Sequence, residues 1–116
     1  MPFIELLTNV KVETQSEQTL THAFGKAIEK VPGKSEQWLM VHIEGGASLY
    51  FAGKDSPCAL LTVKLYGNVP DDGVCDSLSE ELTELAAHEL AIAPDRIYIE
   101  YETTRQWAWR GKHFGR

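Results

Sequence analysis

Cysteine is scarce in this chain of 116 residues, which has two cysteines, Cys58 and Cys75, and no Cys-x-x-Cys pair. This excludes a disulfide framework and a thiol–disulfide motif, and it predicts a reducing compartment and two structural thiols. No apolar run approaches the roughly 20 residues of a membrane-spanning helix. The start lacks a basic segment followed by a long hydrophobic stretch, so we expect no signal peptide. The sequence therefore predicts a cytoplasmic protein without membrane insertion.

Basic residues are also fewer than acidic residues. The chain has 11 Lys and Arg against 17 Asp and Glu, a net charge of −6 and a pI near 5.1. Because no basic patch dominates, we expect no nucleic-acid partner and no anionic-membrane partner. One basic cluster lies in the tail, and we interpret it as a solvated chain end, with a small positive patch as the alternative. Its members are Arg105, Arg110, Lys112, His113 and Arg116.

Motifs for metal and phosphate chemistry are missing as well. The histidines are dispersed, and His88-Glu89 lacks the second histidine of a helical zinc motif. A phosphate-binding glycine loop and a Gly-x-Ser-x-Gly nucleophile motif are both absent. The length and the 43% hydrophobic content predict one domain over residues 1–116, built around one core.

The first half of the chain predicts a strand, a helix and a second strand. Residues 2–10 begin with an almost continuous apolar run, which is typical of a strand buried on both faces. A helix over 15–31 follows, because Thr14-x-x-Glu17 is a capping-box pattern and apolar residues then recur at helical spacing up to a Pro-Gly pair. Residues 38–43 predict the second strand.

The second half repeats this order. Residues 48–51 predict a short edge strand, and 58–66 predict a strong strand rich in leucine and β-branched residues. Residues 67–74 are polar with Gly and Pro, so we expect a loop. A helix over 77–91 starts with a second capping-box pattern, and alternation of apolar and polar residues predicts a strand over 96–103.

The two halves, about 2–43 and 58–101, are therefore predicted to be two copies of one β-α-β unit, followed by a C-terminal tail over 104–116. A right-handed crossover makes the two strands of each unit parallel. The predicted fold class is α+β, with a four-stranded mixed sheet and both helices on one face. The other face of the sheet lacks cover, so we expect the chain to form oligomers through it.

Proline at position 2 gives the start of the chain a chemical role to test. A residue this small normally allows removal of the initiator methionine, which leaves Pro2 with a free secondary amine. The predicted strand that follows would hold this amine in place. An α-amino group titrates at about 7.7–8.0, close enough to neutral pH to act as a base. The alternative is a Met-Pro start that is only a tolerated processing site.

Several stretches, in order along the chain, resemble the macrophage migration inhibitory factor and D-dopachrome tautomerase family of the tautomerase superfamily. They are Met1-Pro2-Phe3-Ile4, Gly33-Lys34 before Trp38-Leu39-Met40-Val41, Ser56-Pro57-Cys58-Ala59-Leu60, Ala93-Pro94-Asp95-Arg96-Ile97-Tyr98-Ile99, and Trp109 through Phe114. No single stretch decides the resemblance. Together they span essentially the whole chain in the order of the family.

The resemblance implies a homotrimer with active sites at the subunit interfaces and keto–enol tautomerisation of small phenylpyruvate-like or dopachrome-like substrates without a cofactor. Pro2 would be the catalytic base, with Lys34 beside it, and Tyr66 would line the site. Tyr98 would come from the neighbouring subunit. The apolar wall would contain Trp109 and Phe114.

Elementary chemistry agrees with these roles and leaves alternatives open. A cation at Lys34 disfavours protonation of a neighbouring amine and could also stabilise an enolate oxygen or pair with a substrate carboxylate. A surface lysine after a helix stop is the alternative. For Tyr98 and for the tryptophans of the tail, Trp107 and Trp109, packing at a subunit contact is the alternative to binding a substrate.

Two departures from the family pattern affect the expected substrate. Tyr66 stands where the family often has a small aliphatic residue, which predicts a narrower or more polar pocket. Glu100 stands where many members have asparagine, and a carboxylate there would repel acidic substrates or raise the pKa of Pro2. The alternative function is a cytokine-like binding protein with vestigial catalysis, whose partner is a cell-surface receptor. The resemblance implies that such a protein can leave the cell without a signal peptide.

Overall fold

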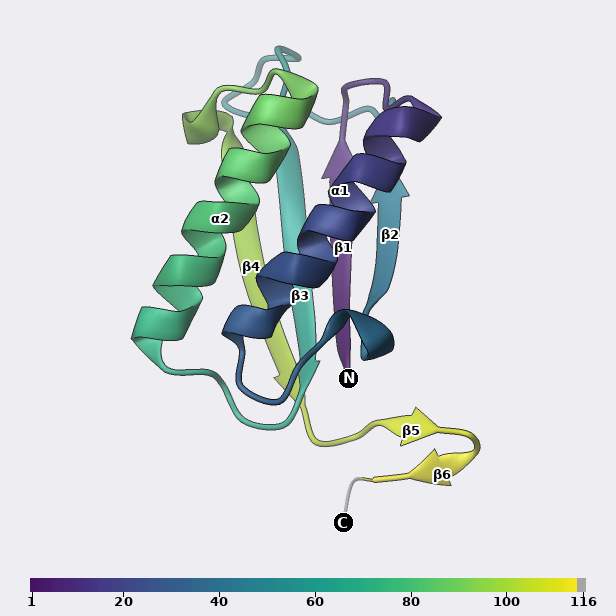
Figure 1. Ribbon diagram of the computed structural model, residues 1–116. Coiled ribbons are helices and arrows are strands. Elements are labelled where there is room, and N and C mark those ends of the chain that lie inside the picture. Colours follow the sequence, from purple (N-terminus) through teal and green to yellow (C-terminus); the bar gives the residue numbers. More distant parts are fainter. Residues whose placement is uncertain (115–116) are drawn as a thin grey trace.

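The computed structural model describes residues 1–114 (Figure 1). The main elements are β1 (Pro2–Thr8), α1 (Thr14–Ala27), β2 (Met40–Glu44), β3 (Ala59–Tyr66), α2 (Asp72–Leu90) and β4 (Ile97–Thr104). A small hairpin follows, made of β5 (Ala108–Trp109) and β6 (Lys112–His113). Short 3₁₀ turns connect the larger elements at η1 (Ile28–Lys30), η2 (Glu36–Trp38) and η3 (Pro94–Arg96).

The sheet has four strands in the order β2-β1-β3-β4. Each β-α-β unit contributes a parallel pair, β1 with β2 and β3 with β4, and the antiparallel pairing of β1 with β3 joins the two units. Helices α1 and α2 lie side by side over one face of this sheet (Figure 1). The predicted four-stranded mixed sheet with both helices on one face is therefore confirmed.

The core lies between the sheet and the two helices. On β1, Ile4 and Leu6 are fully buried against the helices, whereas Phe3, Glu5 and Leu7 point to the other face and are only partly buried. The prediction that this strand is buried on both faces is therefore wrong for the single chain. The physical reason is that strand side chains alternate and the helices cover only one side.

The first helix follows its prediction except at its ends. The α-helical part stops at Ala27 and continues as the tighter turn η1, a common way for a helix to end. The predicted capping box does not form. Glu13 is the N-cap, and its carbonyl accepts the Glu17 N–H at 3.0 Å without a side-chain cap. The capping box is out of position because Thr14 is already the first residue of the helix rather than its cap.

The second helix begins earlier than predicted. It starts at Asp72, so the end of the expected loop over 67–74 is helical and Ser77 lies inside the helix rather than at its cap. An acidic residue in the first turn suits the helix dipole there. Further along, Ser79 and Tyr101 join α2 to β4 through their hydroxyls at 2.9 Å.

Residues 48–51 do not form the short strand that was predicted. In the described part of the chain, this region has only an isolated bridge between Phe51 and Lys54. Instead, the Asn9 side chain holds the loop. Its amide group donates to the carbonyls of Leu49, Asp55 and Ser56, and its oxygen accepts the Cys58 N–H at 3.0 Å. Side-chain bonding therefore organises this loop where a strand ladder was expected.

Two smaller differences shape the end of the sheet at which β1 begins. The second strand begins at Met40 rather than at residue 38, which leaves Trp38 in the turn η2. The predicted tail over 104–116 contains the β5–β6 hairpin, and its first residue still belongs to β4. In Figure 1 this hairpin lies beyond the same end of the sheet as the N-terminus.

Candidate functional site

The first residues of the chain are anchored at one end of the sheet. Pro2 is buried and occupies the first position of β1, opposite Leu65 of β3. Proline fits the first position of a strand because it has no N–H to contribute to the ladder. The backbone N–H of Tyr66 donates to the Met1 carbonyl at 3.2 Å. The terminal amine is thus held against the sheet rather than left to fray.

Lys34 lies beside this amine, where the chain turns back after η1. Its backbone N–H closes a turn on the Val31 carbonyl at 3.0 Å, and Gly33 has a φ of 80°, which glycine adopts without strain. Its ammonium donates to the Tyr66 carbonyl at 3.0 Å. Burial, and after it the charge and a hydrogen bond of Lys34, lower the pKa of the Met1 amine from 8.0 to about 6.

A cavity of about 500 Å³ opens next to Pro2. Much of its wall is aromatic or apolar, contributed by Phe3, Trp38, Met40, Trp107 and Trp109. The Trp38 and Trp109 rings meet edge to face with their centroids 5.0 Å apart. Because aromatic rings bind flat apolar groups well, this cavity suits a small aromatic ligand.

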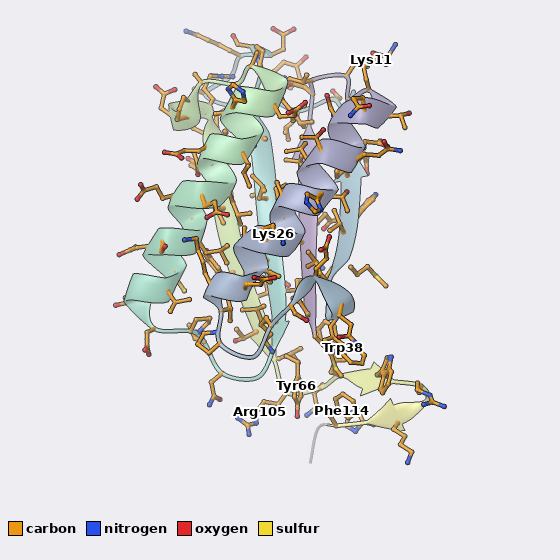
Figure 2. All side chains as sticks on the ribbon, viewed as in Figure 1. Lys11, Lys26, Trp38, Tyr66, Arg105 and Phe114 are labelled. Carbon is orange, nitrogen blue, oxygen red and sulfur yellow. The ribbon has the colours of Figure 1, made fainter. Side chains whose placement is uncertain are left out.

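The tail supplies one side of this cavity and contacts Tyr66. The Phe114 N–H donates to the Trp107 carbonyl at 2.7 Å, which brings the two ends of the hairpin together. The rings of Tyr66 and Phe114 lie 5.5 Å apart, and the Tyr66 hydroxyl is 3.5 Å from the Phe114 carbonyl oxygen. Figure 2 shows Trp38, Tyr66 and Phe114 at this end of the sheet.

The structure thus brings together five of the predicted site residues, Pro2, Lys34, Tyr66, Trp109 and Phe114. The other two, Tyr98 and Glu100, lie elsewhere in the same chain. Both are exposed on the open face of β4. In the register of the sheet Tyr98 lies opposite Leu60, five residues from the position that aligns with Pro2, or roughly 16 Å at ~3.3 Å per strand residue.

Sequence reasoning missed Trp38 as a site residue, because it assigned this tryptophan to the second strand. A weak signal was present, since a large aromatic residue follows a helix stop and a polar segment there. Phe3 and Met40 were also missed as lining residues. Pairing in the sheet places them side by side, and a sequence pattern does not reveal that pairing.

Residues 1–115 match the family model described as macrophage migration inhibitory factor (MIF). The chain belongs to the macrophage migration inhibitory factor family. It is 33% identical over 117 residues to a macrophage migration inhibitory factor homologue of Brugia malayi, with 99% of this chain and 100% of that protein covered. It is 30% identical over 116 residues to the macrophage migration inhibitory factor of Meriones unguiculatus, with 98% and 99% covered.

Solved structures of MIF-family proteins share the fold. Leishmania major MIF2 superposes with a TM-score of 0.91 at 24% identity, covering 98% of this chain and 97% of that one. The macrophage migration inhibitory factor homologue of Prochlorococcus marinus gives a TM-score of 0.84 at 27% identity, with 97% and 99% covered. The MIF family belongs to the tautomerase superfamily, so a keto–enol reaction is the chemistry to test at the N-terminal amine.

Within residues 1–114, no group of three or more His, Cys, Asp or Glu side chains is arranged to hold a metal ion. Cys58 and Cys75 are both free thiols, and burial raises the pKa of Cys75. Neither helix is long and apolar enough to cross a membrane.

Proposed function

We propose that this MIF-family chain is a cofactor-independent keto–enol tautomerase in which the Pro2 amine, freed by removal of Met1, is the general base. The observation that carries the proposal is the anchored terminus: Pro2 is buried at the start of β1, and Lys34 lies beside the terminal amine, where burial and the Lys34 charge lower the pKa of the Met1 amine. After removal of Met1 the amine would belong to the next residue of the same anchored strand. An amine that is mostly neutral at pH 7 can accept a proton from carbon and return it to oxygen.

The surroundings of Pro2 support the remaining roles. The ammonium of Lys34 would stabilise the negative charge that develops on the enolate oxygen. The aromatic cavity would hold the ring of a phenylpyruvate-like substrate, with Trp109 in its wall. Tyr66 and Phe114, which contact each other, would limit the size of the site. These contacts favour a small aromatic keto acid as the substrate.

A homotrimer would complete the site. Tyr98 is 64% exposed and cannot reach Pro2 of its own chain, so a neighbouring subunit would have to supply it. The open face of the sheet carries partly buried Phe3 and Leu7, which a second and a third copy could cover. Glu100 lies on the same face as Tyr98 and would meet the neighbouring site too. Light scattering of the purified protein measures this state, and a monomeric mass would contradict the trimer.

The experiment combines intact mass with a phenylpyruvate tautomerase assay on one sample. If Met1 is absent, we expect turnover in the wild type and a clear loss of activity in Pro2→Gly, because a flexible primary amine replaces the rigid secondary amine of proline. Pro94→Gly in η3, away from the terminal amine, is the matched control and should retain the activity. A protein without Met1 and without turnover would refute the catalytic proposal.

A binding function is the second candidate, and the names of the relatives favour it. The Meriones unguiculatus relative is called macrophage migration inhibitory factor, which describes an effect on cells rather than a reaction. In that case the cavity beside Pro2 would be a vestigial or ligand-binding pocket. Saturable binding to a cell-surface receptor that survives Pro2→Gly would support this function over the catalytic one.

A further inference from the structure

A groove lies between α1 and α2, which cover the face of the sheet opposite to its open face (Figure 1). This helix groove has a volume of about 350 Å³, and its floor is formed by Leu20 and Ala23 of α1 and by Leu85 of α2. Thr19 and His88 lie on its rim together with three glutamates of α2. Because the Ala23 side chain is small, the seam between the helices is hollow there and can accept a large apolar side chain.

The rim of the helix groove is acidic. Its glutamates are Glu81, Glu84 and Glu89, and within residues 1–114 no lysine or arginine belongs to the lining. Lys30 reaches Glu81 from outside the lining, with Nζ 3.3 Å from Oε1, and the Ser16 hydroxyl donates to Glu89 at 3.0 Å. Glu84 is exposed and forms no ion pair in this part of the chain. One lysine against three carboxylates leaves the rim negative.

A basic partner with an apolar side matches the helix groove in both charge and polarity. The net charge of −6 attracts such a partner over a distance, and the rim carboxylates can then pair with its lysines or arginines. Lys26 of α1 (Figure 2) lies outside the lining and does not block these pairs. A purely apolar partner would cover the carboxylates without compensating their charge, which is costly. An acidic partner would be repelled.

The length of the helix groove suits a helix. On α2 the lining runs from Glu81 to Glu89, roughly 12 Å at ~1.5 Å per residue. Two turns of a helix have about this length and present apolar side chains at i, i+3 and i+7 on one side. An amphipathic helix can therefore lie along the seam with its apolar side against the floor. The proposed trimer would use the other face of the sheet, so both contacts are compatible with one assembly.

We propose that the helix groove binds a basic amphipathic helix of a partner protein. A large apolar side chain of that helix would enter the hollow at Ala23, and its lysines or arginines would pair with Glu84 and Glu89. This inference does not depend on the Pro2 amine, because different residues line the groove and the cavity beside Pro2. The competing explanation is that the groove is only a solvent-filled seam between two packed helices.

Fluorescence anisotropy of a labelled peptide tests this docking. The probe is a helical peptide of about 14 residues made of alanine, leucine and lysine, with leucine at i, i+3 and i+7. One control peptide has glutamate in place of lysine, and another has the same residues in a scrambled order. At low salt we expect saturable binding of the basic amphipathic peptide and at least about tenfold weaker binding of both control peptides.

Substitutions in the helix groove locate the binding. Ala23→Lys should weaken binding of the probe about tenfold or more, because the longer side chain fills the hollow and adds a positive charge. Glu84→Lys should weaken it about threefold to tenfold, since a repulsion replaces one exposed charge pair. Gln18→Lys on α1 and Glu29→Lys in η1 are the matched controls. Both positions are exposed and outside the lining, so these variants should bind as the wild type does.

The proposal is overturned if the wild type does not bind the basic peptide or if either control peptide binds as tightly. It is also overturned if Glu29→Lys weakens binding as much as Glu84→Lys, because the effect would then come from net charge alone. If Ala23→Lys does not fold, Glu84→Lys at its exposed position still decides between the two explanations.

Two further measurements show where the peptide binds and whether another copy of the chain occupies the groove. In ¹H–¹⁵N NMR spectra, addition of the peptide should shift amide signals of α1 and α2, and shifts confined to the open face of the sheet would overturn the proposal. Light scattering without peptide should give the same mass for the wild type and Ala23→Lys. A lower mass for Ala23→Lys would assign the groove to a contact between copies and would overturn the proposal as well.

Discussion

Replacing Lys34 by methionine should raise the pKa of the N-terminal amine. The substitution keeps much of the apolar stem and removes the charge. Burial is the largest cause of the lowered pKa of about 6, and the Lys34 charge and hydrogen bond are the second and third. Because a nearby cation disfavours protonation of an amine, its removal raises the pKa. Burial stays, so the pKa of the Met1 amine should lie between about 6 and the ordinary value of 8.0. The Pro2 amine, which takes its place at this end of β1 when Met1 is removed, should shift in the same direction.

The consequence for activity can be worked out from these two limits. At pH 7 an amine with a pKa of about 6 is roughly nine-tenths neutral, whereas one with a pKa of 8.0 is roughly one-tenth neutral. Turnover by a neutral base is lost as pH falls through its pKa. The acid limb of kcat/KM should therefore move to higher pH in Lys34→Met, in addition to any overall loss of activity.

The assay is the pH dependence of phenylpyruvate tautomerisation from pH 5 to 9, with direct titration of the Pro2 amine by ¹⁵N NMR after selective proline labelling. The NMR measurement separates the pKa from the role of Lys34 in binding substrate. Lys26→Met serves as the control and should leave both readouts unchanged. An unchanged or lower amine pKa in folded Lys34→Met would refute the electrostatic argument.

Three further substitutions test how the fold supports the site. Asn9→Ala should lower the free energy of unfolding by about 2–3 kcal/mol, because it leaves several loop groups without their partner; an unchanged urea midpoint would contradict this. Gly25→Ala should change the free energy of unfolding by less than about 1 kcal/mol, because the new Cβ meets only the half-exposed Glu36 side chain, which can move aside, and alanine favours the helix. A large fall in melting temperature would show that Glu36 is held in place. Tyr66→Leu should remove the contact between residue 66 and Phe114 of the tail and make the hairpin more sensitive to protease. Equal cleavage rates of the variant and the wild type would contradict this prediction.

Local sequence patterns determined the main elements and their layers. The period of two in the strands and the period of 3.6 in the helices are set by backbone geometry, so the buried faces of β4 and α1 could be predicted. The right-handed crossover then required parallel pairs within each β-α-β unit. Pro2 and Lys34 could be named from the resemblance to a family, and the structure places both at one end of the sheet.

Features that depend on long-range contacts were decided only by the tertiary structure. The capping box at Thr14 does not form because the helix begins one residue earlier, with Glu13 as its cap. The loop near residue 50 is held by the Asn9 side chain instead of pairing as a strand. The hairpin of the tail has strands too short to leave a periodic signal. Packing alone brings Trp38 against Trp109 and pairs Lys30 with Glu81 across the two helical regions. Neither distance nor charge pairing is encoded locally, because both depend on residues far apart in the chain.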